Sequence, residues 1–182
     1  MYKRQNLSTF SQSNPAFRKS TSKISWLLWY LLSILFISTP LPGSKLRISF
    51  LRLFGAKIGK NCLIKPCVKI KHPWLLRIGD YTWIGEGVTI DNIFPVIIGS
   101  STCISQNVYF CSGNHNFRSS KFEYKKQVIK VHGQCWICAC AILAPGTQIS
   151  RCTVVGIGSS AKGVLSPNSI YYGNPIRLHG PR

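Results

Sequence analysis

Aliphatic residues recur at every sixth position along most of the chain. The clearest run covers residues 131–161, where the repeat residues are Val131, Ile137, Leu143, Ile149, Val155 and Ala161. A period of six fits neither a lone helix (about 3.6) nor an alternating strand (about 2). It predicts short parallel strands wound into a solenoid, with the repeat residue pointing inward from each flat side and stacking coil on coil.

The same register extends back to residue 58. It runs through Ile58, Ile64 and Ile70, shifts by two to Ile78, Ile84 and Ile90, and shifts by two again to Ile98, Ile104 and Phe110. Three steps of six residues make one coil of a three-sided prism, and the shifts read as small insertions at a corner. Glycine follows four of these residues directly (Gly59, Gly79, Gly85 and Gly99), where we expect a tight corner to need a permissive backbone.

One stretch inside the solenoid, residues 114–127 (NHNFRSSKFEYKKQ), has no repeat residue and is polar. It predicts a loop that leaves the prism at a corner, and insertions of this kind on a rigid scaffold often carry function. We therefore expect residues 56–166 to form one β-helix domain with this loop. Pro167, Gly173 and Pro175 are expected to end the solenoid, and residues 167–182 to cap it.

The chain ahead of the solenoid divides into two parts. Residues 1–22 are polar, Ser-rich and basic, which predicts a disordered basic arm. Residues 23–55 are expected to form helices. The apolar stretch 24–38 would make a helix of about 22 Å, too short for a bilayer core of about 30 Å. After Pro40, Pro42 and Gly43, residues 45–54 resume a helical pattern with an apolar side at Leu46, Phe50 and Leu53, and Gly55 is a C-cap candidate.

Two interpretations of the apolar helix remain open at this stage. It packs against the solenoid or a neighbouring subunit, or it lies in a membrane interface, so that residues 24–54 make a peripheral membrane contact. Trp26, Trp29 and Tyr30 suit the membrane boundary. The flanking bases that suit anionic head groups are Lys19, Lys23, Lys45 and Arg47.

The charge balance favours an anionic partner. The chain carries 23 Lys and Arg against four acids, a net charge of +19, and has no acid before Asp80. A membrane surface, nucleic acid or a phosphorylated ligand would fit. No recognised nucleic-acid motif occurs, so we do not expect that partner.

Eight cysteines and no recognisable cleavable signal lead us to expect reduced thiols and a cytoplasmic protein, with the inner face of the membrane as a second location. Cys135, Cys138 and Cys140 lack the further Cys or His pair that a zinc site needs, so no metal is expected.

Four motifs resemble the hexapeptide-repeat acyltransferases, most of all the colanic-acid biosynthesis acetyltransferase branch. They are WIGEGVTIDN at 83–92, SGNHN at 112–116, CWI at 135–137 and YYGNPIR at 171–177. The resemblance implies a mainly β fold, a left-handed parallel β-helix, in a homotrimer that binds acetyl-CoA between subunits. It also implies an O-acetyltransferase that moves acetyl to a hydroxyl of a sugar or lipid-linked sugar in surface-polysaccharide biosynthesis.

By this resemblance His115 is the catalytic base, because an imidazole with a pKa of about 6.5 can take a hydroxyl proton near neutral pH. Asp91 and Asn114 would bind the acceptor, and Trp136, Lys162 and Arg177 would bind the cofactor. The other histidines have weaker support: His132 is expected at an exposed corner, and His72 and His179 fit no pattern.

The sequence departs from the family at three positions. Asn116 stands where relatives often have aspartate, and Cys138 and Cys140 stand where glycine is usual. An amide can orient an imidazole but stabilises imidazolium less than a carboxylate does. These departures support the alternative of a non-catalytic solenoid scaffold that binds a membrane or an acidic partner.

Overall fold

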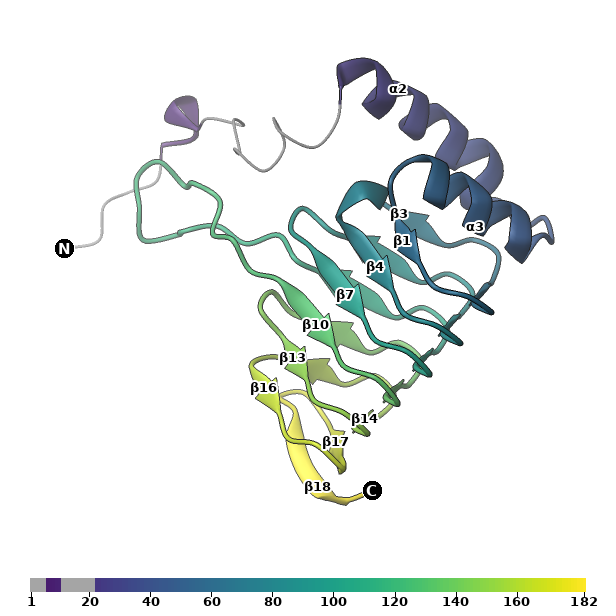
Figure 1. The fold of residues 1–182 in the computed structure, drawn as a ribbon. Helices are drawn as coiled ribbons and strands as arrows, with labels where there is room; N and C mark the ends of the chain where they lie inside the picture. Colours follow the sequence, from purple (N-terminus) through teal and green to yellow (C-terminus); the bar gives the residue numbers. More distant parts are fainter. Residues whose placement is uncertain (1–5, 11–21) are drawn as a thin grey trace.

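The computed structural model describes residues 6–10 and 22–182, and it forms a three-walled parallel β-helix with two helices at one end (Figure 1). Wall A consists of β1 (Lys57–Ile58), β4 (Leu76–Ile78), β7 (Val96–Ile98), β10 (Ile129–Val131), β13 (Gln148–Ile149) and β16 (Val164–Leu165). Wall B consists of β2 (Leu63–Ile64), β5 (Trp83–Ile84), β8 (Cys103–Ile104), β11 (Trp136–Ile137), β14 (Val154–Val155), β17 (Ser169–Tyr172) and β18 (Arg177–Pro181). Wall C consists of β3 (Lys69–Ile70), β6 (Thr89–Asp91), β9 (Tyr109–Cys111), β12 (Ile142–Leu143) and β15 (Ser160–Ala161).

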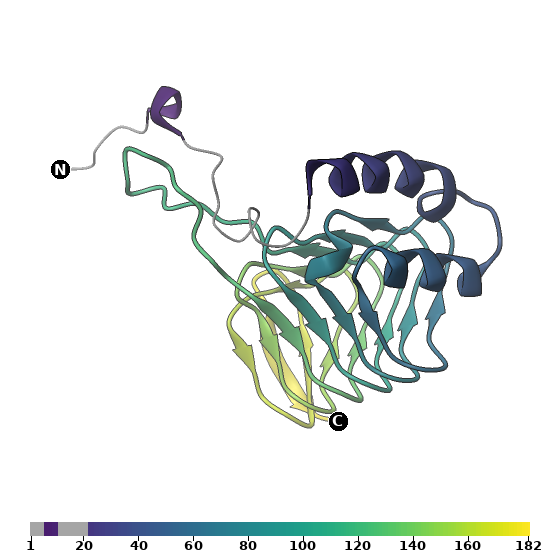
Figure 2. The same cartoon turned by 45° about the horizontal axis from the view of Figure 1, so that its top comes forward.

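The period-six prediction is confirmed by the strand register. Ile58 pairs with Ile78, Ile78 with Ile98, and Ile98 with Val131 across the shift that the loop introduces. These side chains are buried in one continuous core between the three walls. Figure 2 shows the stacked coils of the walls from a second direction. Stacked aliphatic side chains of this kind contribute about 1.5–3 kcal/mol each when fully buried.

The role expected for the glycines is corrected by the structure. Gly59, Gly79, Gly85 and Gly99 do not adopt positive φ. A Cβ atom on Gly79 would lie 2.5 Å from the backbone nitrogen of Ser100 on the next coil. Glycine is therefore needed there because the neighbouring coil passes too close for a side chain, and not because the corner needs a special backbone conformation.

Helix α2 (Lys23–Leu32) continues into a π-helical turn, η2 (Ser33–Ile37), and lies beside wall C. Trp29 is 3% exposed, and its indole Nε1 donates to the carbonyls of Ile70 at 3.2 Å and Lys71 at 3.1 Å. The suggestion that Trp29 lies at a membrane boundary is therefore wrong, since this residue anchors the helix to the solenoid. Within the described residues, no helix has both the length and the apolar character to cross a bilayer.

Helix α3 (Ser44–Leu53) buries a different face from the one expected. Its buried residues are Arg47, Ile48 and Leu51, whereas Leu46 and Leu53 are exposed. Arg47 turns inward because its guanidinium satisfies carbonyls of the preceding turn, those of residues 37, 39 and 41. Arg47 is therefore unavailable to the head groups of a membrane.

The solenoid extends further than the sequence indicated. Strand β16 lies within the expected residues 56–166, but β17 continues wall B beyond them and pairs in parallel with β14. Strand β18 then folds back antiparallel on β17 and carries His179 in an exposed position. The last coil thus has its wall B edge covered by the chain's own C-terminus.

Candidate active site

The polar loop 114–127 leaves the prism where wall C passes to wall A, between β9 and β10, as predicted. It projects away from the prism, on a different side from helices α2 and α3 (Figure 1). An isolated antiparallel bridge between His115 and Tyr124 closes its base. The loop therefore presents His115 at its root, next to the rigid walls.

His115 is held by its own loop. Its Nδ1 lies 2.7 Å from the carbonyl oxygen of Phe122, and a carbonyl can only accept, so Nδ1 carries the proton in this contact. The imidazole stacks on the Phe122 ring with 4.2 Å between centroids and also contacts Tyr124 at 4.3 Å. In the neutral ring this arrangement leaves the lone pair on Nε2, the form that a general base requires.

The two asparagines beside His115 have different partners. The side-chain oxygen of Asn114 accepts from the backbone N–H of His115 at 2.9 Å, and its amide group donates to Gln127. Asn116 donates from Nδ2 to Glu123 at 2.8 Å. The Phe122 carbonyl, which no sequence motif marked, therefore orients the imidazole. Asn116 instead stabilises the loop through Glu123.

Part of the N-terminal arm lies against this loop. Residues Leu7–Thr9 form a 3-10 turn, and the backbone N–H of Asn6 donates to the carbonyl of Ser120 at 2.9 Å. Phe10 contacts both His115 and Tyr124, each at 5.6 Å between ring centroids. The rest of the expected disordered arm, residues 1–5 and 11–21, lies outside the described residues.

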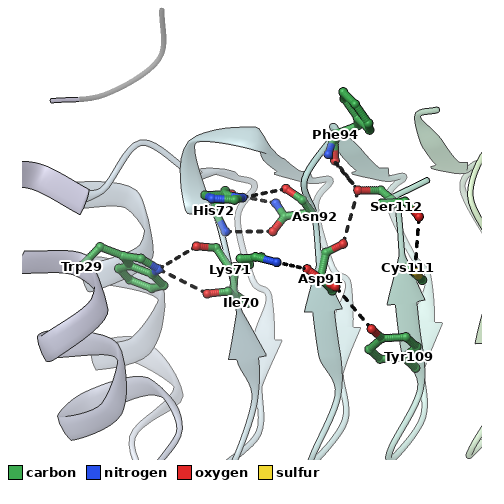
Figure 3. A network of polar contacts seen from close by, with 11 residues as sticks. Trp29, Ile70, Lys71, His72, Asp91, Asn92, Phe94, Tyr109, Cys111 and Ser112 are labelled. Atoms are coloured by element: carbon green, nitrogen blue, oxygen red, sulfur yellow. Dashed lines mark hydrogen bonds and ion pairs between the residues drawn. The ribbon is translucent and has the colours of Figure 1, made fainter. Parts of the chain in front are cut away.

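Asp91 faces a cavity of about 560 Å³ between helix α2 and wall C. Its Oδ1 lies 2.9 Å from the ammonium of Lys71, and its Oδ2 accepts from the hydroxyl of Tyr109 at 3.4 Å (Figure 3). Burial, followed by the charge of Asp91, raises the pKa of Tyr109 to about 12, so the phenol remains a donor at neutral pH.

The backbone connects this cavity with the loop, but the side chains of Asp91 and His115 bond to different partners. The carbonyl of Asp91 accepts from the backbone N–H of Ser112 at 3.1 Å, and His115 follows three residues later. The Asp91 carboxylate bonds to residues of wall C, whereas the His115 ring bonds within the loop. Asp91 and His115 are therefore linked through the backbone, but their side chains do not form a hydrogen-bonded pair with each other.

A buried polar contact that the sequence did not predict joins the first two coils at this cavity, which His72 helps to line. His72 and Asn92 are 1% and 0% exposed. The side-chain oxygen of Asn92 accepts from the backbone N–H of His72, its amide donates to the His72 carbonyl, and Nδ1 of His72 bonds to the Asn92 carbonyl (Figure 3). The sequence did contain a signal for this contact, because both residues stand two positions after a repeat isoleucine in successive coils.

The three residues expected at the cofactor lie on two sides of the prism. Lys162 is exposed just after β15, on the edge between walls C and A that carries the loop, two coils further on. Trp136 points outward from wall B, 47% exposed, and its indole donates to Ser105 at 2.9 Å. Arg177 is exposed at the start of β18. One chain thus places His115 and Lys162 on one edge, and Trp136 and Arg177 on wall B.

The backbone at Cys140, one of the two positions where glycine is usual, has a conformation that favours glycine. Cys140 has φ of 59°, a conformation that glycine adopts at little cost, and Gly158 has φ of 64° one coil later. Burial raises the pKa of the Cys138 thiol. All eight cysteines are free thiols, and the described residues contain no cluster of three or more His, Cys, Asp or Glu arranged to hold a metal.

Comparison with known proteins gives a consistent result, although no family model matches the chain. The chain is 39% identical over 171 residues to WcaF of Escherichia coli K12, which is named for colanic acid biosynthesis acetyltransferase activity; the match covers 94% of this chain and 93% of that protein. It is 26% identical to the galactoside O-acetyltransferase of the same organism, over 72% of this chain and 66% of the relative.

Solved structures show the same fold. A hexapeptide-repeat acetyltransferase of Vibrio cholerae in complex with acetyl coenzyme A superimposes with a TM-score of 0.78 at 19% identity, covering 95% of this chain and 93% of that one. A maltose O-acetyltransferase of Clostridium difficile 630 gives a TM-score of 0.77 at 21% identity, covering 88% and 89%. These likenesses support the expected left-handed β-helix.

Proposed function

Because the chain belongs to the hexapeptide-repeat acetyltransferase family that includes WcaF, we propose that it transfers the acetyl group of acetyl-CoA to a sugar hydroxyl during surface-polysaccharide assembly, with His115 as the base. The single observation that carries the assignment of His115 is its contact with the Phe122 carbonyl. That contact keeps the proton on Nδ1 and the lone pair on Nε2.

The chemistry needs one shuttled proton. Nε2 of His115 takes the proton of the acceptor hydroxyl as the oxygen attacks the thioester carbonyl, which becomes tetrahedral. When the carbon–sulfur bond breaks, the imidazolium returns the proton to the departing CoA thiolate. The Phe122 carbonyl supports the transient imidazolium through Nδ1, because a charge-assisted hydrogen bond is stronger than a neutral one. Asn114 fixes the backbone of His115 beside the acceptor.

We propose that the enzyme is a homotrimer and that acetyl-CoA binds between subunits. Within one chain, His115 and Trp136 lie on different sides of the prism, so one solenoid does not bring them to a single cleft. Wall B of one subunit facing the loop edge of the next would bring them together. Lys162 and Arg177 would then pair with the CoA phosphates. Trp83 also lies on wall B, where it pairs with Cys103 of the next coil, and its side chain is 57% exposed. It adds apolar surface for such an interface.

We further propose that residues 24–54 contact the cytoplasmic face of the membrane, where a lipid-linked acceptor would be presented. Helix α2 exposes Leu27 and Leu31, and η2 exposes Leu35, each at least half exposed. The segment also carries the exposed bases Lys23 and Lys45. Apolar side chains flanked by bases suit an anionic interface. Co-sedimentation with vesicles of phosphatidylglycerol, compared with phosphatidylcholine vesicles, tests this: equal retention on both, or on neither, would contradict it.

The main test is acetyl transfer by His115→Ala. We expect a loss of at least about 100-fold in kcat, in the range that general-base catalysis contributes, with assembly unchanged by sedimentation velocity. The matched control is His132→Ala, an exposed corner histidine outside the loop. Turnover by His115→Ala at the wild-type rate would refute the assignment, and wild-type protein that neither binds nor turns over acetyl-CoA would favour the non-catalytic scaffold.

A further inference from the structure

We propose that the cavity between helix α2 and wall C is a saccharide subsite that holds a second sugar ring of the acceptor, beyond the ring that is acetylated. The inference rests on the proposed function, because it takes the acceptor to be a sugar. It adds that the preferred acceptor has two or more rings, and that α2 supplies part of the specificity.

One side of the cavity is an aromatic platform. The rings of Trp26 and Tyr30 stack nearly parallel, with 6.0 Å between centroids and 12° between planes, and both line the cavity. They remain 46% and 54% exposed. Broad aromatic faces left open beside a cavity match the apolar C–H face of a sugar ring, whose hydroxyls then point sideways.

The opposite side is polar and can bind those hydroxyls. Lys71, Asp91 and Tyr109 line the cavity together (Figure 3). The ammonium has three donors, of which the contact with Asp91 uses one. Oδ1 of Asp91 is buried against this ammonium, so Oδ2 is the carboxylate oxygen that can accept from a sugar hydroxyl. The Tyr109 phenol remains protonated at neutral pH; it donates to Oδ2 of Asp91, and its oxygen can accept from a sugar hydroxyl.

The platform is fixed relative to the polar side before any ligand arrives. Trp29, on the same helix, is buried and donates to the carbonyls of Ile70 and Lys71. The Lys71 backbone therefore carries both the anchor of the helix and one of the polar groups. A site that is already organised avoids part of the ordering cost of binding.

Two observations identify the occupant. The residues that line the cavity come from α2, η2, wall C and the residues directly after η2 and β3, and none comes from the loop that carries His115. A ring bound here is consequently not the ring whose hydroxyl meets the imidazole. An alkyl chain fits poorly, because it would bury the Lys71–Asp91 ion pair against hydrocarbon without replacing its solvation.

The test compares Trp26→Ala with Leu28→Ala, a control on the same helix whose side chain is 48% exposed and does not line the cavity. The acceptors are the methyl glycoside of the accepted sugar and the soluble two- and three-ring oligosaccharides that contain it. We expect Trp26→Ala to raise KM for the longer acceptors about tenfold relative to the methyl glycoside, with kcat little changed. Leu28→Ala should keep the wild-type preference.

Binding is also measured by calorimetry on the His115→Ala protein without acetyl-CoA, so this reading does not depend on catalysis. Oligosaccharide affinity that Trp26→Ala lowers about tenfold in this background supports the subsite even if His115 is not the base. Equal affinities for Trp26→Ala and Leu28→Ala would overturn it. The proposal would also be overturned if an octyl glycoside bound more tightly than the methyl glycoside and Trp26→Ala removed that difference, since the cavity would then be an alkyl-chain site.

Discussion

His72 and Asn92 bond to each other across two successive coils, through both backbone and side-chain groups, although both are almost fully buried. His72 and Asn92 directly follow Lys71 and Asp91 in the chain, and His72 lines the cavity between helix α2 and wall C together with those two residues. Buried polar groups that are fully satisfied fix one register between elements. The pair therefore sets the position of the candidate acceptor groups as well as the stacking of the coils.

Asn92→Ala should lower the free energy of unfolding by about 1–3 kcal/mol, because it removes the side-chain oxygen that accepts from the buried backbone N–H of His72. Urea unfolding followed by circular dichroism measures the change. Gln148→Ala, at an exposed outward position of wall A, is the control and should stay within about 0.5 kcal/mol of wild type. A similar small effect at Asn92 would contradict the structural role given to the pair.

Stability should depend on pH through His72. Burial is the main cause that lowers its pKa, with Lys71 adding to the shift, while the Asn92 carbonyl and the Asp91 charge oppose it. Below the usual His pKa of about 6.5 the unfolded chain binds a proton that the folded protein does not, so the free energy of unfolding falls as pH falls from about 7 toward the lowered pKa.

This dependence is measured as the difference between unfolding free energies at pH 7.5 and 5.5, in wild type and in His72→Gln. We expect a smaller difference in the variant, because the substituted amide does not titrate. The other histidines are common to both proteins and cancel in the comparison. An identical difference in the two proteins would show that His72 does not contribute.

Gly79→Ala should destabilise the solenoid by about 1–3 kcal/mol, as overpacking of a tight contact does, because the new Cβ would meet backbone atoms of Ser100 at 2.5 Å. Gly180→Ala is the matched control, since its Cβ would have no neighbour within 4 Å. Thermal unfolding of both variants gives the comparison. Equal melting temperatures for the two would mean that the coils separate easily at this corner.

The family pattern and the structure agree on the loop but differ on the partner of its histidine. The motif SGNHN identified His115, but Asn116, where relatives often have aspartate, left the partner of the imidazole undecided. The partner in the structure is the carbonyl of Phe122, which the loop brings back to the ring. A backbone carbonyl is present at every residue, so no residue type could have marked it in advance.

The N-terminal helices show a similar division. Their existence, the break at Pro40–Gly43 and the C-terminal Gly55 could be predicted from local composition. The buried face of α3 could not, because Arg47 ranks as a surface residue by type and is buried only where carbonyls of another segment converge on it. Trp29 was likewise misplaced, since its two acceptors lie more than 40 residues away in the chain.

The sequence by itself determined the three-walled prism, its inward column and the corner from which the loop leaves. It could do so because one coil repeats within about 20 residues, and the inward positions follow from that local geometry. Only the tertiary structure decided which groups meet at the cavity and at His115. The contact of Trp29 with the solenoid and that of His115 with Phe122 involve segments that the repeat does not relate, and in both the acceptors are backbone carbonyls, which no residue type marks.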